Sequence, residues 1–242
     1  MSNYPNVEQV GFLSDGQLNM AGGEFCGNAT RSSAFLILDG KPGEIKLKVS
    51  GVKNTLVCGV NQNLEAYAQM PIYSDPKKIT PIKQPNGSSD FLVEMEGISH
   101  LITFNTALIS GLSENEIKQI AKNRITDLNL DKLPAAGVIF TQKQGDLYKI
   151  TPVVYVRDID TLFLETACGS GTTALGLVLS KTTNQSIKQV PILQPSGMNI
   201  KISVNFSNKK FKNAFIEGPI EPISSGEIYY NFISNQSYVS QI

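Results

Sequence analysis

"GGEFCGNATRSSAFLIL", at residues 22–38, is repeated in outline by "LETACGSGTTALGLVL" at residues 164–179. In both stretches an acidic residue is followed by a cysteine, a glycine, a small turn, a threonine and an apolar run. Cys26 and Cys168 lie 142 residues apart (168 minus 26), which is too long for a solenoid period but suits two copies of one domain. The pattern therefore predicts an internal duplication.

The composition indicates a globular chain whose partner is a small molecule. The 242 residues are 41% hydrophobic, which is enough for the core of one large domain or of two small ones. Twenty-one basic side chains balance 21 acidic ones, so no net field favours nucleic acid or an anionic membrane. The start "MSNYPNVEQV" lacks the features of a signal peptide, and no apolar run is long enough to span a bilayer, so we expect a cytoplasmic protein.

The cysteine and histidine content limits metal and redox chemistry. Three cysteines without a Cys-x-x-Cys pair do not make a disulfide framework and indicate reduced thiols. His100 is the single histidine of the sequence, which leaves too few nitrogen ligands near the thiols. We therefore expect no metal site.

Short strands dominate the expected secondary structure, which places the chain in the α+β class. The clearest surface helix is "SENEIKQIAKNR", which opens with the capping-box spacing of Ser113 and Glu116. Residues 72–90 are rich in Pro, Lys and Ser and predict a long loop. We place the boundary between the halves near residue 105. The β-rich segments in the first half span 44–50, 55–60, 64–70, 91–95 and 98–104.

The runs that follow the two cysteines, "SSAFLIL" and "TALGLVL", are apolar on nearly every side. Each run therefore predicts a central helix that is buried all round and wrapped by strands. A thiol at the first turn of such a helix faces unpaired N–H groups and the positive end of the helix dipole, which favour the thiolate and lower the thiol pKa. A carboxylate also binds well at such a place.

If the two halves face each other, Cys26 and Cys168 lie on opposite sides of one cleft. One thiolate could then remove a proton from a carbon next to a carboxylate, while the opposite thiol returns a proton to the other face. This two-base arrangement would invert the configuration of that carbon.

More ordinary interpretations exist for each of these residues. A single Cys-Gly before an apolar run is most often a small buried residue at a turn, and Cys58 fits the core of a strand. Glu24 and Glu165 could each be an ordinary surface charge, although Glu165 lies in an apolar stretch where a carboxylate needs a partner. His100 lies in an apolar strand and suits a core or cleft-wall position better than the role of a catalytic base. Arg31 could reach a substrate carboxylate, although such a residue more often faces solvent.

At "EFCGNATRS" and "ETACGSGT" the chain resembles the diaminopimelate epimerase superfamily, which includes the proline racemases and needs no pyridoxal cofactor. "EQVGF", "KVSG", "QMP" and "QPSG" make it more similar to one branch, the histidine racemases that supply D-histidine for opine-type metallophores. The resemblance covers nearly all of the chain. It implies an α+β fold of two pseudo-symmetric halves, each a β-barrel-like sheet around one central helix.

By that resemblance the halves are residues 1–105 and 106–227, and residues 228–242 are candidates to return to the first half. It implies that Cys26 and Cys168 are the two acid/base residues and that no cofactor is used. The substrate would be a small-molecule amino acid. The residues that the resemblance implies at the substrate are Glu8, Gly27, Asn28, Gly169 and Ser170. Glu165 is a further candidate there because of its place in an apolar stretch.

The sequence also departs from the diaminopimelate epimerases. "TLFLETACG" lacks the arginine that these enzymes use to grip the distal end of the substrate, and "AAGVIF" has Gly137 where an amide would help. The first half looks short, as if its N-terminal strand and loop were missing. Losing a strand leaves an open sheet edge, and dimerisation through that edge is one expectation.

Three functions follow from these observations. The favoured one is a cofactor-independent amino-acid racemase or epimerase with histidine as the first substrate to test; a diaminopimelate epimerase is the alternative within this class. The second is a non-catalytic relative that binds an amino acid. A thiol-based redox protein is a distant third, because the chain has no Cys-x-x-Cys.

Overall fold

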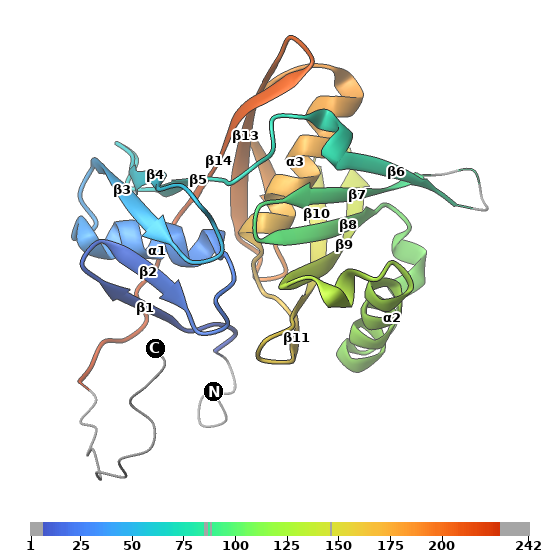
Figure 1. Ribbon diagram of the computed structural model, residues 1–242, viewed down its shortest axis with the longest axis horizontal. Coiled ribbons are helices and arrows are strands. Elements are labelled where there is room, and N and C mark those ends of the chain that lie inside the picture. Colours follow the sequence, from blue (N-terminus) through green and yellow to red (C-terminus); the bar gives the residue numbers. More distant parts are fainter. Residues whose placement is uncertain (1–6, 85–86, 88, 146, 228–242) are drawn as a thin grey trace.

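The computed structural model describes residues 7–84, 87, 89–145 and 147–227. These residues form two lobes, each with one central helix against a curved sheet, and the lobes share a single continuous run of strands (Figure 1). The chain is thus α+β and dominated by strands, as the sequence predicts. No helix among the described residues is long and apolar enough to cross a membrane.

The first lobe is built from the N-terminal third of the chain. Its helix α1 packs against β3, β4 and β5. The strand β2 pairs parallel with β3, and β1 forms the outer edge of the sheet. The elements are β1 (Gly11–Ser14), β2 (Gln17–Met20), α1 (Gly27–Ile37), β3 (Gly43–Val49), β4 (Leu56–Val60) and β5 (Ala66–Gln69).

The second lobe surrounds the longer helix α3, which contacts β7, β8, β12, β13 and β14. The surface helix α2 lies outside, against β9, β10 and β11. The elements are η1 (Pro76–Lys78), β6 (Ile79–Lys83), β7 (Ser89–Met95), β8 (Ile98–Thr103), η2 (Thr106–Ile109), α2 (Glu114–Asp127), η3 (Leu130–Lys132), β9 (Ala135–Gln144), β10 (Leu147–Val156), β11 (Thr161–Leu164), α3 (Gly169–Thr183), β12 (Ile187–Leu193), β13 (Asn199–Ser207) and β14 (Lys210–Gly218).

The boundary predicted near residue 105 needs correction. β6, β7 and β8 precede it in the sequence, but β8 pairs parallel with β9, and β7 and β8 pack on α3. All six residues of β8 are buried, so this strand needs the apolar surface of α3 to cover it. The chain therefore passes from the first lobe to the second between β5 and β6. The proposed return of residues 228–242 to the first half lies outside the described residues.

The predicted loop at 72–90 is also only partly correct. It contains η1 and the strand β6, which lies at the outer edge of the second lobe and pairs with β7. Pro81 sits within β6. An edge strand tolerates proline because one side of it has no pairing partner to lose.

The three expected helices form, but the two central ones differ in burial. α2 begins with the predicted capping box, in which the Ser113 N–H donates to Glu116 Oε2 at 2.7 Å. α3 is buried on nearly every side, as expected. α1 is not buried all round, because its residue Leu36 is 64% exposed. The edge strand β1 of the same lobe is also exposed at every residue. The first lobe therefore covers its helix less completely than the second.

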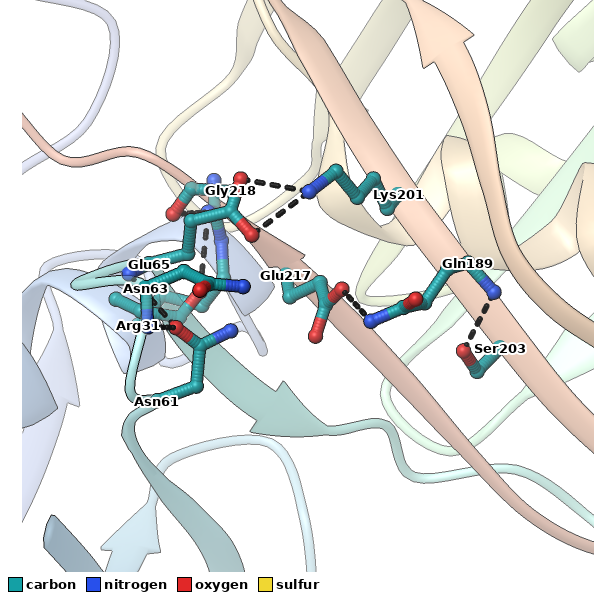
Figure 2. A network of polar contacts seen from close by, with 10 residues as sticks. Arg31, Asn61, Asn63, Glu65, Gln189, Lys201, Ser203, Glu217 and Gly218 are labelled. Carbon is teal, nitrogen blue, oxygen red and sulfur yellow. Dashed lines mark hydrogen bonds and ion pairs between the residues drawn. The ribbon is translucent and has the colours of Figure 1, made fainter. Parts of the chain in front are cut away.

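The two lobes are joined where β5 pairs with β14, with Gln69 opposite Phe215. Figure 2 shows the polar contacts along this seam. Lys201 on β13 reaches Glu65, just before β5, with Nζ–Oε distances of 2.8 and 2.7 Å. Arg31 of α1 donates to the carbonyl of Gly218 at the end of β14, at 3.0 Å. These contacts fix the orientation of α1 relative to the second lobe.

Candidate active site

Cys26 and Cys168 occupy equivalent positions, each as the N-cap residue of a central helix. Their backbone angles are almost the same, with φ/ψ of −131°/112° at Cys26 and −127°/105° at Cys168. Each sulfur accepts a hydrogen bond from the first turn of its helix, from the Ala29 N–H at 3.4 Å and from the Gly171 N–H at 3.2 Å. The duplication seen in the sequence is therefore a duplication of local structure.

The two helix starts meet at one cavity between the lobes. The Asn28 side-chain amide crosses the interface and donates to the carbonyl of Ala167 at 2.9 Å. A Cβ added at Gly169 would lie 3.2 Å from Asn28 Oδ1, which shows how closely the helix starts approach each other. The side chains that line the cavity include Gln9, Glu24, Cys26 and Asn28 from the first lobe and Glu165, Cys168 and Ser170 from the second.

The predicted site glycines serve packing as well as ligand approach. A Cβ at Gly27 would lie 2.9 Å from Met70 Cε, and one at Gly169 would lie 2.7 Å from Ile216 Cδ1. Small residues at these positions allow both helix starts to sit against the apolar side chains at the β5–β14 seam. The sequence predicts the glycines but not this reason for them.

The expectation of lowered thiol pKa values is wrong. Burial raises the pKa of Cys26 to about 12 and holds that of Cys168 well above its usual value. The N–H groups at the helix starts oppose this effect, as expected, but they do not overcome it. Negative charge on Glu165 raises both pKa values further. Burial therefore favours the protonated form of both thiols.

A buried carboxyl group lies near each thiol. Glu165 is 6% exposed, and burial raises its pKa to about 8, while a hydrogen bond with Cys168 opposes that shift. Glu24 is 3% exposed, burial raises its pKa as well, and its Oε2 has no hydrogen-bond partner within the described part of the chain. The interpretation of Glu24 as a surface charge is therefore wrong.

Gln9 is a cavity residue that the sequence analysis missed. The Cys26 thiol donates to Gln9 Oε1 at 2.8 Å, and the Gln9 amide lies 3.4 Å from Glu24 Oε1. A groove that runs along α1 meets the cavity at Gln9, Cys26 and Asn28. The Gln9 side chain thus stands where a ligand would reach Cys26. The only signal for it is its place in "EQVGF" next to the predicted Glu8.

Glu8 lies at the rim of the site rather than among the residues that line the cavity. Its Oε1 accepts a hydrogen bond from the Thr166 N–H at 2.8 Å, across the interface between the lobes. Glu8 also lines the groove along α1. The structure therefore brings together all the predicted site residues, with Glu8 at the edge.

Arg31 lies neither in the cavity nor toward solvent. It is 4% exposed, and its guanidinium donates to the carbonyl of Gly218 at 3.0 Å and to Asn28 Oδ1 at 3.0 Å. The same Asn28 side chain donates to Ala167. Arg31 therefore orients a residue of the site and does not itself contact the cavity.

Cys168 has a second set of polar neighbours on its own lobe. Its N–H donates to Gln194 Oε1 at 2.9 Å, and its sulfur lies 3.5 Å from Ser170 Oγ. Ser170 Oγ is in turn 2.8 Å from Nε2 of His100, which is fully buried as expected for a core histidine. Among the described residues, no group of three or more His, Cys, Asp and Glu side chains could hold a metal ion.

Two pseudo-symmetric lobes with one helix-capping cysteine each on a shared cavity define the diaminopimelate epimerase-like class of racemases and epimerases. Residues 2–229 match the family described as the histidine racemase CntK N-terminal domain. The chain belongs to this family and is an isomerase. The predicted resemblance and fold are confirmed.

Relatives and solved structures agree with this placement. A histidine racemase of Fusobacterium nucleatum is 32% identical over 233 residues, which cover 92% of this chain and 81% of that protein. A histidine racemase of Staphylococcus aureus is 24% identical, with 92% and 83% covered. A hydroxyproline epimerase from Agrobacterium vitis superposes with a TM-score of 0.57 at 9% identity over 87% and 71% of the two chains. A PhzF-type protein from Clostridium difficile gives 0.57 at 15% identity over 93% and 84%.

Proposed function

We propose that the protein racemises a free α-amino acid without a cofactor, with histidine as its substrate and Cys26 and Cys168 as its two acid/base residues. The observation that carries this proposal is the pair of cysteines that cap facing helices and line one cavity. Family membership supports the reaction, and the histidine racemases among the relatives support the substrate.

The substrate carboxylate binds between the two helix starts. The first N–H groups of a helix have no partner within the helix, and the positive end of the dipole adds to their attraction for an anion. Gly27 and Asn28 provide these groups on α1, and Gly169 and Ser170 provide them on α3. A carboxylate held there places the neighbouring Cα between the two sulfur atoms.

Racemisation then needs one thiolate and one thiol. The thiolate takes the proton from Cα, and the opposite thiol gives its proton to the other face of the same carbon. One C–H bond breaks and another forms with inverted configuration, while thiolate and thiol exchange roles. The overall charge is unchanged, and the reverse reaction uses the same two groups.

The first thiolate forms when the substrate enters. The ammonium group of the amino acid brings a positive charge into a cavity that otherwise holds two buried carboxyl groups, and this charge favours thiolate over thiol. Glu165 receives the Cys168 proton in its carboxylate form, and the pKa of about 8 that burial gives it makes this carboxylate a stronger base than an ordinary glutamate. For the reverse direction Glu24 serves Cys26 in the same way, while Cys168 keeps its proton. Glu24 Oε2 has no hydrogen-bond partner among the described residues, so it is available for that proton or for the substrate.

Diaminopimelate is the alternative substrate. The absence of an arginine in "TLFLETACG" argues against it, because a site that grips a charged distal group relies on such polar contacts. A non-catalytic amino-acid-binding protein is the alternative outside this class. No described feature favours it over the racemase, but it makes a distinct prediction: ligand binding without proton exchange.

The experiment that separates these functions is a panel of L-amino acids, histidine and diaminopimelate among them, incubated with the reduced protein and resolved on a chiral column. We expect the D-enantiomer from histidine alone. An epimerised product from diaminopimelate instead would show that diaminopimelate, and not histidine, is the substrate. No product from any member, combined with saturable binding of one of them, would favour the non-catalytic function.

Three further properties belong to this proposal. The three free cysteines suit a reducing, cytoplasmic compartment. The resemblance to one branch suggests that the D-amino acid supplies metallophore synthesis. Homodimerisation would use the exposed edge at β1, where Phe12 is 63% exposed and Leu13 38% exposed. Light scattering of the purified chain tests the last of these.

A further inference from the structure

Arg31 is a buried cation that no carboxylate of the described residues neutralises. Its guanidinium donates to the carbonyls of Gly218 and Ala66, at 3.0 and 3.4 Å, and to Asn28 Oδ1 at 3.0 Å. All three acceptors are neutral, Nε has no partner in the described part of the chain, and none of the ion pairs found there includes Arg31. Because buried charges are normally paired, this guanidinium can accommodate an anion.

The carboxylate that the chain itself offers is already engaged. Glu65 acts electrostatically on Arg31, but Lys201 holds both of its oxygens, at 2.8 and 2.7 Å (Figure 2). Burial lowers the pKa of Arg31 to about 10, so the guanidinium keeps its positive charge at neutral pH. Gly218 makes room for this group, because a Cβ there would lie 3.2 Å from Arg31 Nη1. The fold thus holds a charged guanidinium in place without pairing it.

A second cavity lies beside this guanidinium. Its volume is about 450 Å³, which suits a small molecule, and neither Cys26 nor Cys168 lines it. It is bounded by the start of α1, the residues just before α3, the connection between β12 and β13, and the chain that follows β14. Ser32, Thr166 and Ser196 line it together with Arg31, and their hydroxyl groups can donate to or accept from the polar atoms of a ligand.

The charges around the second cavity favour a zwitterion. Arg31 and Glu221 are the charged side chains among the described residues that line it. A guanidinium binds a carboxylate strongly, and the Glu221 carboxylate attracts an ammonium group. A dianion such as phosphate would be repelled by Glu221 as well as attracted by Arg31. An α-amino acid carries one group of each sign and therefore matches these charges.

We infer that the second cavity binds a zwitterionic amino acid, with its carboxylate at Arg31 and its ammonium group toward Glu221. The second cavity shares Asn28 with the cavity between the thiols. A carboxylate at Arg31 competes with Asn28 Oδ1 for the guanidinium N–H groups, so it weakens the support of the bond from Asn28 to Ala167 and lowers kcat. The effect on kcat rests on the proposed function, whereas the binding does not.

The Nε–H signal of Arg31 in proton–nitrogen NMR reports this binding directly. The chain has three arginines, Arg31, Arg124 and Arg157, so Arg124→Lys and Arg157→Lys assign the signal without a change at Arg31. The probe is glycine, which is achiral and is therefore not consumed by a racemase. We expect the Arg31 signal to shift and to saturate as glycine is added. Acetate at the same ionic strength lacks the ammonium group and should bind more weakly.

Asn199→Asp blocks the second cavity without removing Arg31. Asn199 is an exposed residue of the lining, and a carboxylate there repels the carboxylate of the ligand. Asn205→Asp, exposed on the same strand β13, is the matched control. We expect glycine to bind about tenfold more weakly or less in Asn199→Asp and as in the wild type in Asn205→Asp. An Arg31 signal that responds equally in Asn199→Asp, or does not respond in the wild type, would overturn the inference.

Racemisation of histidine in the presence of glycine tests the connection to the thiols. Glycine that binds only between the thiols raises KM and leaves kcat unchanged, whereas glycine in the second cavity lowers kcat. We expect kcat to fall several-fold in the wild type and Asn205→Asp but not in Asn199→Asp. An unchanged kcat in the wild type at saturating glycine would overturn this connection. If the wild type racemises no amino acid, the NMR titration still decides the binding, and the proposed function fails separately.

Discussion

Asn28 of the first lobe donates its side-chain amide to the carbonyl of Ala167, the residue before Cys168, and thereby ties one helix start to the other across the cavity. Asn28 is itself held by Arg31, whose guanidinium donates to Asn28 Oδ1 and to the carbonyl of Gly218. The distance between the two thiols therefore depends on a short chain of hydrogen bonds that starts in the core of the first lobe.

Replacing Asn28 tests this connection. Asn28→Asp puts a carboxylate against the Ala167 carbonyl and leaves the buried Arg31 in place. We expect kcat/KM to fall by on the order of 100-fold, because misplacing catalytic groups by about 1 Å costs that much. Steady-state kinetics measure the change, with Lys46→Met on the exposed face of β3 as a control for altered charge. A loss of less than about threefold would show that the bond does not position the site.

Replacing Gln9 should make Cys26 more reactive. Gln9→Ala removes both the acceptor that holds the thiol proton and a side chain that lines the α1 groove beside Cys26. We expect alkylation of Cys26 to accelerate several-fold while Cys58 is unaffected, as measured for each cysteine by mass spectrometry. An unchanged rate at Cys26 would show that Gln9 neither shields the thiol nor keeps it protonated.

Glu165 should make stability depend on pH. Burial raises its pKa in the folded protein to about 8, above the usual value of 4.5. Between these values the unfolded chain binds fewer protons than the folded one, so stability falls as pH rises from about 4.5 to about 8 and then levels off. Glu165→Gln should remove this fall and be more stable than the wild type above pH ~8, by at most about 5 kcal/mol.

Chemical denaturation at several pH values measures this effect, and Glu221→Gln in the exposed C-terminal stretch serves as a control. The same Glu165→Gln variant should lose activity, because its amide cannot take up the Cys168 proton. Parallel stability curves for wild type and Glu165→Gln would contradict the placement of a buried carboxyl group at this position.

Gly137→Ala should disturb both stability and the position of His100. The new methyl group would approach His100 Nδ1 to 2.5 Å and the Val153 carbonyl oxygen to 3.0 Å, and the second of these contacts is with main chain that cannot turn away. We expect a loss of roughly 1–3 kcal/mol in thermal or chemical unfolding. Gly226→Ala is the matched control, because a Cβ there meets nothing within 4 Å. Equal stabilities of the two variants would contradict the packing of His100 against β9.

Much of the fold could be predicted from the paired motifs alone. Each Cys-Gly stretch followed by an apolar run indicated a helix start with a thiol at its first turn. Both helix starts are present, and the two cysteines are their N-cap residues with nearly equal backbone angles. The division of the chain could not be predicted as well. β8 is near the end of the first predicted half, but its pairing with β9 and its contact with α3 depend on tertiary structure.

The site was predicted in its residues but not in its electrostatics. A helix start favours a thiolate, yet the pKa of Cys26 is raised because burial outweighs that effect, and the degree of burial cannot be read from local sequence. Gln9 and Arg31 were missed or misplaced for a similar reason. Their roles depend on contacts with Cys26 and with Gly218, which are far away in the sequence.

The central claim is that both thiols carry the proton at Cα. Proton NMR of L-histidine in deuterated water with the reduced protein tests it most directly, using the wild type, Cys26→Ala, Cys168→Ala and, as a control, Cys58→Ala. We predict that the α-proton signal disappears with the wild type and with Cys58→Ala, and that it persists, with racemisation lost, when either Cys26 or Cys168 is replaced. Racemisation that continues without one of these two cysteines would contradict the account.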